Sequence, residues 1–137
     1  MASFNFSIPM EVRFRDLDAL GHVNNAVYLT YFEVVRTHYW RHLFDLRSYE
    51  DFNFLVVRIE CNFRSPAMFG ETLRIAAAVR ELKNSSFVFE YEVTDQETGR
   101  LIADGLSVQA CFDKQEKRSV PIPNEMRSKI KQFEGLP

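Results

Sequence analysis

Apolar and polar residues alternate in four runs through the second half of the sequence. The runs cover residues 55–63, 73–79, 87–93 and 102–112. A period of two places successive side chains on opposite faces of a strand, so each run predicts a half-buried β-strand. Turn-forming residues at 83–86 and 97–100 separate the last three runs. These three strands are therefore expected to form a long, curved antiparallel meander.

The apolar positions of each run are expected to face the core. In the first run they are Leu55, Val57, Ile59, Cys61 and Phe63, and in the last run they are Ile102, Leu106, Val108, Ala110 and Phe112. Residues 8–15 alternate in the same way, with Val12 and Phe14 as apolar members. They predict one further strand near the N-terminus.

The segment at 26–44 has a different pattern, because it is apolar around most of a helical circumference. Its polar residues Thr30, Glu33 and Thr37 mark only one narrow stripe. A helix of this kind is mostly surrounded by protein rather than lying on a surface. The segment therefore predicts a long central helix.

Capping residues indicate where the helices begin and end. Asn24 or Asn25 is a natural N-cap for the long helix, and a short C-terminal helix is expected between a cap at Asn124 and Gly135. The order of strand, long helix, four strands and short helix predicts an α+β fold, with the long helix wrapped by a curved antiparallel sheet. The sequence contains no repeat or linker, so residues 1–137 are expected to form a single domain.

Composition excludes several classes of protein. Hydrophobic residues make up 46% and charged residues 26% of the 137 residues, which excludes disordered, collagen-like and coiled-coil chains. With 17 basic and 19 acidic residues the formal charge is -2, so the basic excess of a nucleic-acid binder is missing. No apolar run approaches the roughly 18 residues of a membrane helix, and the first residues lack the pattern of a secretory signal.

Cysteine and phenylalanine usage bears on location and assembly. Cys61 and Cys111 lie in apolar, alternating segments rather than in a Cys-x-x-Cys pair, so we interpret them as reduced core residues of a cytoplasmic protein. The 13 Phe residues supply bulky side chains for a core or for a subunit interface. Together with the expected sheet edge, they favour a homodimer or homotetramer.

Residues 16–25, DLDALGHVNN, hold the densest group of chemically capable side chains, directly before the long helix. The first N–H groups of a helix are unpaired and its dipole is positive there, so they can stabilise an oxyanion on an acyl carbonyl. A nearby carboxylate stays ionised in that field and can attack the carbonyl or deprotonate water. The pattern therefore predicts an acyl-transfer site, although ordinary turn and cap chemistry explains the same residue types.

Other combinations of reactive residues are weaker candidates. Asp16 and Asp18 could be a metal-binding pair, but no further oxygen ligands cluster beside them. His38 and His42 have the spacing of zinc ligands, but no Glu follows His38, so helix packing or a surface position is favoured. The two cysteines lack an obvious histidine partner, which disfavours a nucleophilic role. We therefore expect no metal and no cofactor.

Two segments carry a resemblance to a known family. Residues 12–28, VRFRDLDALGHVNNAVY, and the aromatic-rich continuation to Thr37 resemble hotdog-fold acyl-CoA thioesterases of the 4-hydroxybenzoyl-CoA thioesterase type. Residues 62–67, NFRSPA, and 70–73, GETL, are similar to the family's second strand and the turn after it. The Asp-x-Asp-x-x-Gly-His-Val-Asn-Asn stretch is the most specific part, and it implies a hotdog fold.

The resemblance also implies roles for individual residues. Asp18 matches the catalytic carboxylate, and the helix-opening amide that polarises the thioester carbonyl falls on Asn25. Gly21 would let the backbone approach the acyl group, and His22 matches a position that only some relatives use for catalysis or substrate orientation. Asp16 would shape the loop. Glu33 sits where hotdog subfamilies differ in which carboxylate they use, so it is a second, weaker candidate for the catalytic carboxylate. The substrate-binding candidates are Asn24, Tyr28, Glu33, Arg64, Lys83 and Ser85, of which Arg64, Lys83 and Ser85 could contact the phosphates of coenzyme A at the rim of the sheet.

The implied activity is hydrolysis of an acyl-CoA thioester to a free carboxylic acid and coenzyme A. An acyl-carrier protein remains open as the donor, and a solvated surface role is an equal alternative for Arg64, Lys83 and Ser85. A second reading is a non-catalytic hotdog module that binds an acyl-CoA or an acyl-carrier protein. A third is a hotdog dehydratase, for which only His22 could supply the catalytic imidazole. No nucleic-acid or membrane partner is expected.

Overall fold

The computed structural model describes residues 3–47 and 53–137. The elements along the chain are β1 (Ser7–Glu11), the 3-10 turn η1 (Phe14–Asp16), α1 (Val27–Leu43), β2 (Phe54–Phe63), β3 (Thr72–Leu82), β4 (Ser86–Asp95), β5 (Leu101–Asp113), β6 (Arg118–Ser119) and α2 (Asn124–Glu134). The expected order of a strand, a long helix, four strands and a short helix is confirmed, with η1 and the two-residue β6 as additions.

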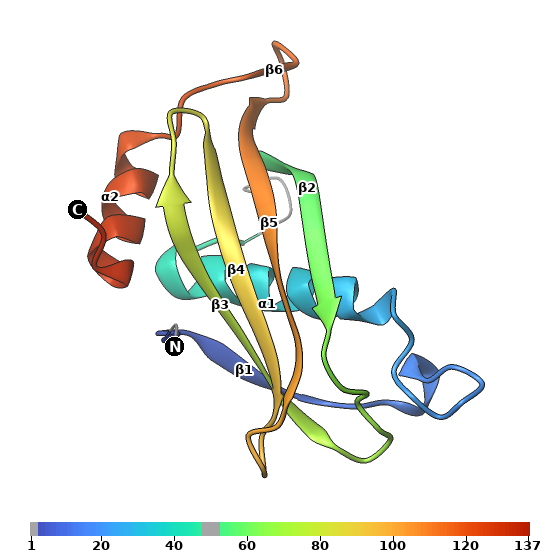
Figure 1. Ribbon diagram of the computed structural model, residues 1–137. Coiled ribbons are helices and arrows are strands. Elements are labelled where there is room, and N and C mark those ends of the chain that lie inside the picture. Colours follow the sequence, from blue (N-terminus) through green and yellow to red (C-terminus); the bar gives the residue numbers. More distant parts are fainter. Residues whose placement is uncertain (1–2, 48–52) are drawn as a thin grey trace.

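The strands form one antiparallel sheet in the order β1-β3-β4-β5-β2, which is not closed into a barrel. β6 pairs only with β5. Helix α1 runs across one face of the curved sheet, and α2 lies beside the end of β3 (Figure 1). The predicted α+β fold, with a long helix against a curved antiparallel sheet, is confirmed.

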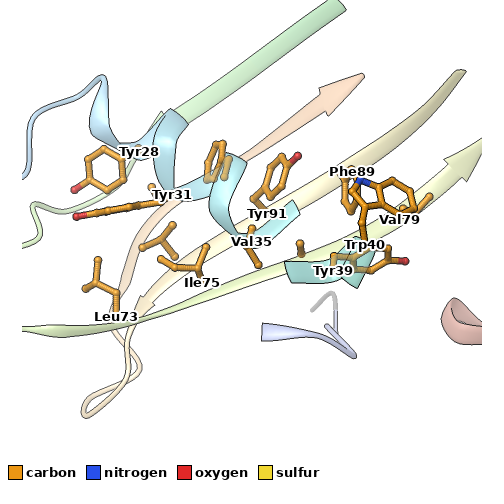
Figure 2. Packing of buried hydrophobic residues seen from close by; sticks show 14 of the residues in the cluster. Tyr28, Tyr31, Val35, Tyr39, Trp40, Leu73, Ile75, Val79, Phe89 and Tyr91 are labelled. Atoms are coloured by element: carbon orange, nitrogen blue, oxygen red, sulfur yellow. The ribbon is translucent and has the colours of Figure 1, made fainter. Parts of the chain in front are cut away.

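Aromatic rings fill the space between α1 and the sheet. Phe32 stacks on Tyr91 with ring centroids 4.3 Å apart, and the Trp40 ring meets Phe89 edge to face at 5.5 Å. Figure 2 shows Tyr31, Val35 and other α1 side chains meeting residues of β3 and β4 in the same cluster. Gly105 permits this close approach, because a Cβ there would lie 2.9 Å from the Phe32 ring.

The side of α1 that faces away from the sheet carries the predicted polar stripe. Thr30 and Glu33 are exposed there, together with Leu29 at 38%. The apolar residues expected to be surrounded by protein are all buried or half-buried: Val27, Tyr28, Tyr31, Phe32, Val35, Tyr39 and Leu43. The exposed side of α1 is available to a further surface.

The prediction for the inward face of β2 is correct only at Ile59 and Cys61, which are half-buried, whereas Phe63 is 52% exposed. A bulge between Val56 and Arg58 inserts one residue into the pairing of β2 with β5. Leu55 and Val57 are consequently exposed by 51% and 62%, whereas Phe54 packs against the Trp40 ring at 5.1 Å. Beyond such a bulge, the residues of a strand that would point inward point outward instead. The alternation of apolar and polar residues in the sequence does not reveal where a bulge lies.

The prediction for β5 is wrong over most of its length. Ile102 is buried as expected, but Ser107, Gln109 and Cys111 are buried as well, and the predicted face of Leu106, Val108, Ala110 and Phe112 is the opposite, partly exposed one. Polar side chains can occupy these inward positions because their hydrogen bonds are made inside the protein. The Ser107 hydroxyl donates to Gln109 Oε1, and Gln109 Nε2 donates to the Phe87 carbonyl at 3.3 Å.

Several boundaries also differ from prediction. The first strand ends at Glu11, and Phe14 lies in η1 with 80% of its surface exposed, although Val12 is buried as expected. α2 has Pro123 rather than Asn124 at its N-cap position, and it ends as predicted at Gly135 with φ of 70°. Within residues 3–47 and 53–137, neither helix is long and apolar enough to cross a membrane.

Candidate active site

The loop before α1 is anchored by an ion pair between the buried Asp16 and Arg13, whose side chain is 54% exposed. Asp16 is 2% exposed, and its carboxylate accepts hydrogen bonds from Arg13 Nη2 at 2.8 Å, from the Arg13 backbone N–H at 3.0 Å and from the Tyr31 hydroxyl at 2.9 Å. Burial alone raises the pKa of Asp16, but these hydrogen bonds outweigh burial and hold the pKa below its usual value. This is the loop-shaping role that was expected for Asp16.

Asp16→Asn is expected to lower the free energy of unfolding at neutral pH by about 2 kcal/mol, because the charged acceptor of three hydrogen bonds is lost. The pKa of Asp16 is lower in the folded than in the unfolded chain, so its contribution is complete above about pH 4–5 and disappears as pH falls through the folded-state pKa. Urea unfolding of parent and variant between pH 3 and 7 measures this difference.

Asp45→Asn is the matched control for that experiment. Asp45 pairs with Arg47 at 3.2 Å, but both side chains are more than 80% exposed. Its replacement is expected to change stability by less than about 0.5 kcal/mol. If Asp16→Asn shows the same small effect at every pH, the ion pair does not anchor the loop.

Further backbone bonds fix the loop against the segment that follows β2. The Val23 N–H donates to the Ala67 carbonyl at 2.9 Å, and the Asn24 N–H donates to the Asp16 carbonyl at 2.8 Å. The Tyr28 hydroxyl accepts the Ala67 N–H at 3.3 Å. The loop is thus held between η1, α1 and residue 67, and Asp18 is presented from a supported backbone.

Asp18 is half-buried and bonds asymmetrically. Its Oδ1 accepts the Leu20 N–H at 2.8 Å and the His22 N–H at 3.2 Å, while its own N–H donates to the His22 carbonyl at 2.7 Å. Among the described residues no hydrogen bond is made to Oδ2. The tight turn requires φ of +79° at Gly21, a conformation that suits glycine, and a Cβ at Gly21 would meet no atom within 4 Å. One carboxylate oxygen is therefore anchored and the other is available.

The start of α1 leaves the backbone N–H groups of Asn25 and Tyr28 without an acceptor in the described chain. The Asn24 side chain accepts the Ala26 N–H, and the Asn24 carbonyl accepts the Val27 N–H, both at 2.9 Å. The N-cap position of α1 is Ala26, so the predicted cap at Asn24 or Asn25 is wrong; the Asn24 side chain holds the turn that precedes the helix, which begins at Val27. Within the described part of the chain, the Asn25 backbone N–H makes no hydrogen bond. It is a free donor at the positive end of the helix.

A cavity of about 360 Å³ brings these groups together. It is lined by Asp18, His22, Val23, Asn25, Tyr28, Phe63, Arg64, Ser65 and Pro66. The volume is sufficient for part of a small-molecule ligand, and both the free carboxylate oxygen and the free helix N–H belong to groups on its wall. The arrangement can position an acyl carbonyl between a nucleophile or base and an oxyanion donor.

The sequence of this chain was compared with known protein families. The family model of the thioesterase-like superfamily matches residues 12–130. The chain belongs to this superfamily. The expectation of a hotdog-fold thioesterase, and thus of a thioester hydrolase rather than a dehydratase, is confirmed at the level of the family.

Individual relatives of this thioesterase agree with that assignment. The long-chain acyl-CoA thioesterase FadM of Escherichia coli is 30% identical over 90% of this chain and 96% of the relative. The acyl-CoA thioesterase YbgC of Haemophilus influenzae is 27% identical over 93% and 96%. A thioesterase of Thermus thermophilus, solved in complex with coenzyme A and Zn, is 36% identical, covers 100% of both chains and superposes with a TM-score of 0.88.

The remaining predicted site residues of this thioesterase lie at different distances from the cavity. Arg64 lines it and is held by Asp104, with Nε 3.1 Å from Oδ2. Glu33 is exposed on α1 and is not part of the cavity wall. Lys83 and Ser85 lie in the turn between β3 and β4, at the opposite end of the sheet, where the Ser85 carbonyl accepts the Cys111 N–H.

Four wall residues had no predicted role in the site: Val23, Phe63, Ser65 and Pro66. Phe63 and Ser65 line the cavity beside Tyr28, and the Tyr28 and Phe63 rings are 5.5 Å apart. Both belong to the NFRSPA segment that resembles the family, and this was the available signal. Ser65 Oγ donates to the Leu101 carbonyl at 2.7 Å, so its hydroxyl serves to fix the wall.

The weaker candidates occupy structural positions in the thioesterase. His42 packs against Phe6, with ring centroids 5.3 Å apart, and His38 is exposed. Burial, reinforced by Asp104, raises the pKa of the Cys61 thiol to about 11, which makes it a poor nucleophile at neutral pH. Within the described ranges, no three His, Cys, Asp or Glu residues are grouped as a metal site would require.

Proposed function

We propose that this thioesterase hydrolyses acyl-CoA thioesters to a free carboxylic acid and coenzyme A, with Asp18 as the catalytic carboxylate and residues 1–137 acting as one catalytic domain. The observation that carries the proposal is the pairing, on one cavity wall, of an Asp18 oxygen without a hydrogen bond and an Asn25 N–H without an acceptor. The names of the acyl-CoA thioesterase relatives and the coenzyme A complex of the Thermus thioesterase support the substrate class.

The reaction begins with the thioester carbonyl between these two groups. Asp18 Oδ2 attacks the carbonyl carbon, or it removes a proton from a water molecule that attacks instead. The Asn25 N–H donates to the oxygen as it becomes negative. The C–S bond then breaks, and coenzyme A leaves as a thiolate, which is a good leaving group because the pKa of an ordinary thiol is about 8.5. Water finally releases the carboxylic acid where Asp18 has formed an anhydride.

A second copy of the chain is part of this proposal. β2 is an edge strand that pairs only with β5, and it exposes Leu55, Val57 and Phe63 by 51%, 62% and 52%. A ten-residue edge strand with exposed apolar side chains favours pairing with another strand. Antiparallel pairing of two β2 strands continues the sheet and forms a homodimer, and a homotetramer would require a further contact between sheet faces.

Such a dimer gives a role to the residues that lie far from the cavity in one chain. Antiparallel pairing places the Phe54 end of one β2 beside the Phe63 end of the other. The turn with Lys83 and Ser85 adjoins the Phe54 end, since Ser86 pairs with Ala110 of β5 and Leu55 pairs with the same residue. Lys83 and Ser85 of the second copy thereby approach the cavity with Asp18, and with Arg64 they are suited to bind the phosphates of coenzyme A.

The test is release of free thiol, followed with a chromogenic reagent, from short-, medium-, long-chain and aromatic acyl-CoA compounds and from the same acyl groups on an acyl-carrier protein. We expect turnover of at least one acyl-CoA, and the panel identifies the preferred acyl group and donor. Saturable binding without thiol release would instead support the non-catalytic module. If only acyl groups on an acyl-carrier protein are hydrolysed, the proposed mechanism stands, but the donor is the carrier protein and not coenzyme A. The free cysteines are consistent with a cytoplasmic location for this reaction.

A further inference from the structure

A buried positive charge lies outside the proposed catalytic site. Arg36, on α1, is 8% exposed and belongs to the layer between the helix and the sheet. Its guanidinium donates one hydrogen bond, from Nη1 to the Tyr91 hydroxyl at 3.1 Å, and lies 5.9 Å from the Tyr91 ring centre. In the described part of the chain, Arg36 takes part in no ion pair.

The residues beneath Arg36 supply polar atoms but no negative charge. The Ser107 hydroxyl donates to Gln109 Oε1, so the Tyr91 hydroxyl donates to Ser107 and its oxygen accepts from Arg36. Burial raises the pKa of Tyr91, with Arg36 and Ser107 acting in the opposite direction, so the phenol remains neutral at neutral pH. The network therefore orients the guanidinium without neutralising it, and most of its five N–H donors are left for another acceptor.

The nearest complementary group in the sequence is Glu33, one helical turn earlier. Glu33 is exposed on the open side of α1, and within the described residues its carboxylate makes no ion pair or hydrogen bond. Residues three apart share a helix face. In a two-fold dimer whose α1 helices run antiparallel, a contact between Glu33 of one copy and Arg36 of the other occurs twice, because a residue contact across a two-fold axis is reciprocal.

The position of Arg36 agrees with the proposed β2 edge. Arg36 bonds to Tyr91 of β4, and Ser107, the next member of the network, lies on β5 and pairs with Ile59 of β2, so the network extends from Arg36 to the strand beside the edge where the second copy is expected. We propose that Glu33 of a second copy of this chain pairs with Arg36, and that two such reciprocal pairs orient the α1 helices across the dimer interface. This inference rests on the dimer of the proposed function and adds the residues that define its geometry.

The first measurement is the subunit dissociation constant of the parent, Glu33→Gln and Glu97→Gln chains, by sedimentation and by dilution of a fluorescently labelled dimer. Glu33→Gln removes both reciprocal pairs, so we expect its dissociation constant to rise at least about tenfold. Glu97, an exposed carboxylate in the turn between β4 and β5, is the matched control, and its replacement is expected to change the constant by less than about twofold. An unchanged constant for Glu33→Gln overturns the inference.

The second measurement distinguishes pairing between copies from pairing within one helix. Glu33→Arg leaves two cations on each copy and Arg36→Glu leaves two carboxylates, so each variant alone is expected to dimerise poorly. A mixture of the two is expected to recover the parent association, because every contact between unlike copies is again complementary. A pair within one helix would give no recovery on mixing.

The outcomes separate this inference from the proposal it rests on. A parent chain that sediments as a monomer contradicts the dimer and the charge pair together. A parent dimer that is indifferent to Glu33→Gln contradicts the charge pair alone and leaves the assignment of Asp18 untouched. If Arg36→Glu does not fold, the Glu33→Gln result still decides, since the Glu33 carboxylate makes no ion pair or hydrogen bond in the described chain that its loss would disturb.

Discussion

Asp18→Asn is expected to lower kcat for acyl-CoA hydrolysis by about 10³-fold or more, while the circular dichroism spectrum and the sedimentation of the protein stay unchanged. The asparagine oxygen can replace Oδ1 as the acceptor of the Leu20 and His22 N–H groups, so the turn is preserved. The amide nitrogen then occupies the place of Oδ2, and it can neither attack a carbonyl nor accept a proton from water. Steady-state thiol release measures the loss.

His22→Ala separates this effect from general damage to the cavity. The backbone N–H and carbonyl of His22 hold the Asp18 turn, and alanine keeps both. Its kcat is therefore expected to fall much less than that of Asp18→Asn. An equal loss in the two variants would place the imidazole among the catalytic groups, and near-parental activity of Asp18→Asn would contradict the proposed mechanism.

Asn25→Pro is expected to lower kcat by about 10²-fold, because it deletes a backbone N–H on the cavity wall that has no acceptor in the described chain. Asn25 lies two residues before Val27, where α1 begins, so the missing N–H of a proline removes no hydrogen bond of the described chain. Measurement of kcat and KM separates loss of transition-state stabilisation from loss of substrate binding.

Asn25→Ala is the matched control, since it removes the side chain and keeps the N–H. We expect its kcat to remain within a few-fold of the parent value. If the alanine variant is as impaired as the proline variant, the Asn25 side chain carries the effect, and the assignment of the oxyanion donor to the backbone is wrong.

The predictability of the fold varies from element to element for identifiable reasons. Phe87, Phe89 and Val93 of β4 are buried as the alternation predicts, because a central strand with regular pairing obeys the period of two. β2 departs from it at the bulge near Val57, and β5 departs from it where Ser107 and Gln109 are buried in a polar network. Both departures depend on contacts with other strands and cannot be read from one segment alone.

The local sequence was sufficient to indicate the fold class, the element order and the loop from Asp16 to Asn25, because periodicity, capping and turn chemistry act between near neighbours. Only the tertiary structure decided that the buried Asp16 pairs with Arg13 and accepts a hydrogen bond from Tyr31, while Asp18 keeps one oxygen free. It also brought Phe63 and Arg64 to the Asp18 cavity and left Arg36 without a counter-charge in the described chain. These contacts join residues that are far apart in sequence, and their geometry depends on how the strands curve and on how closely α1 approaches the sheet.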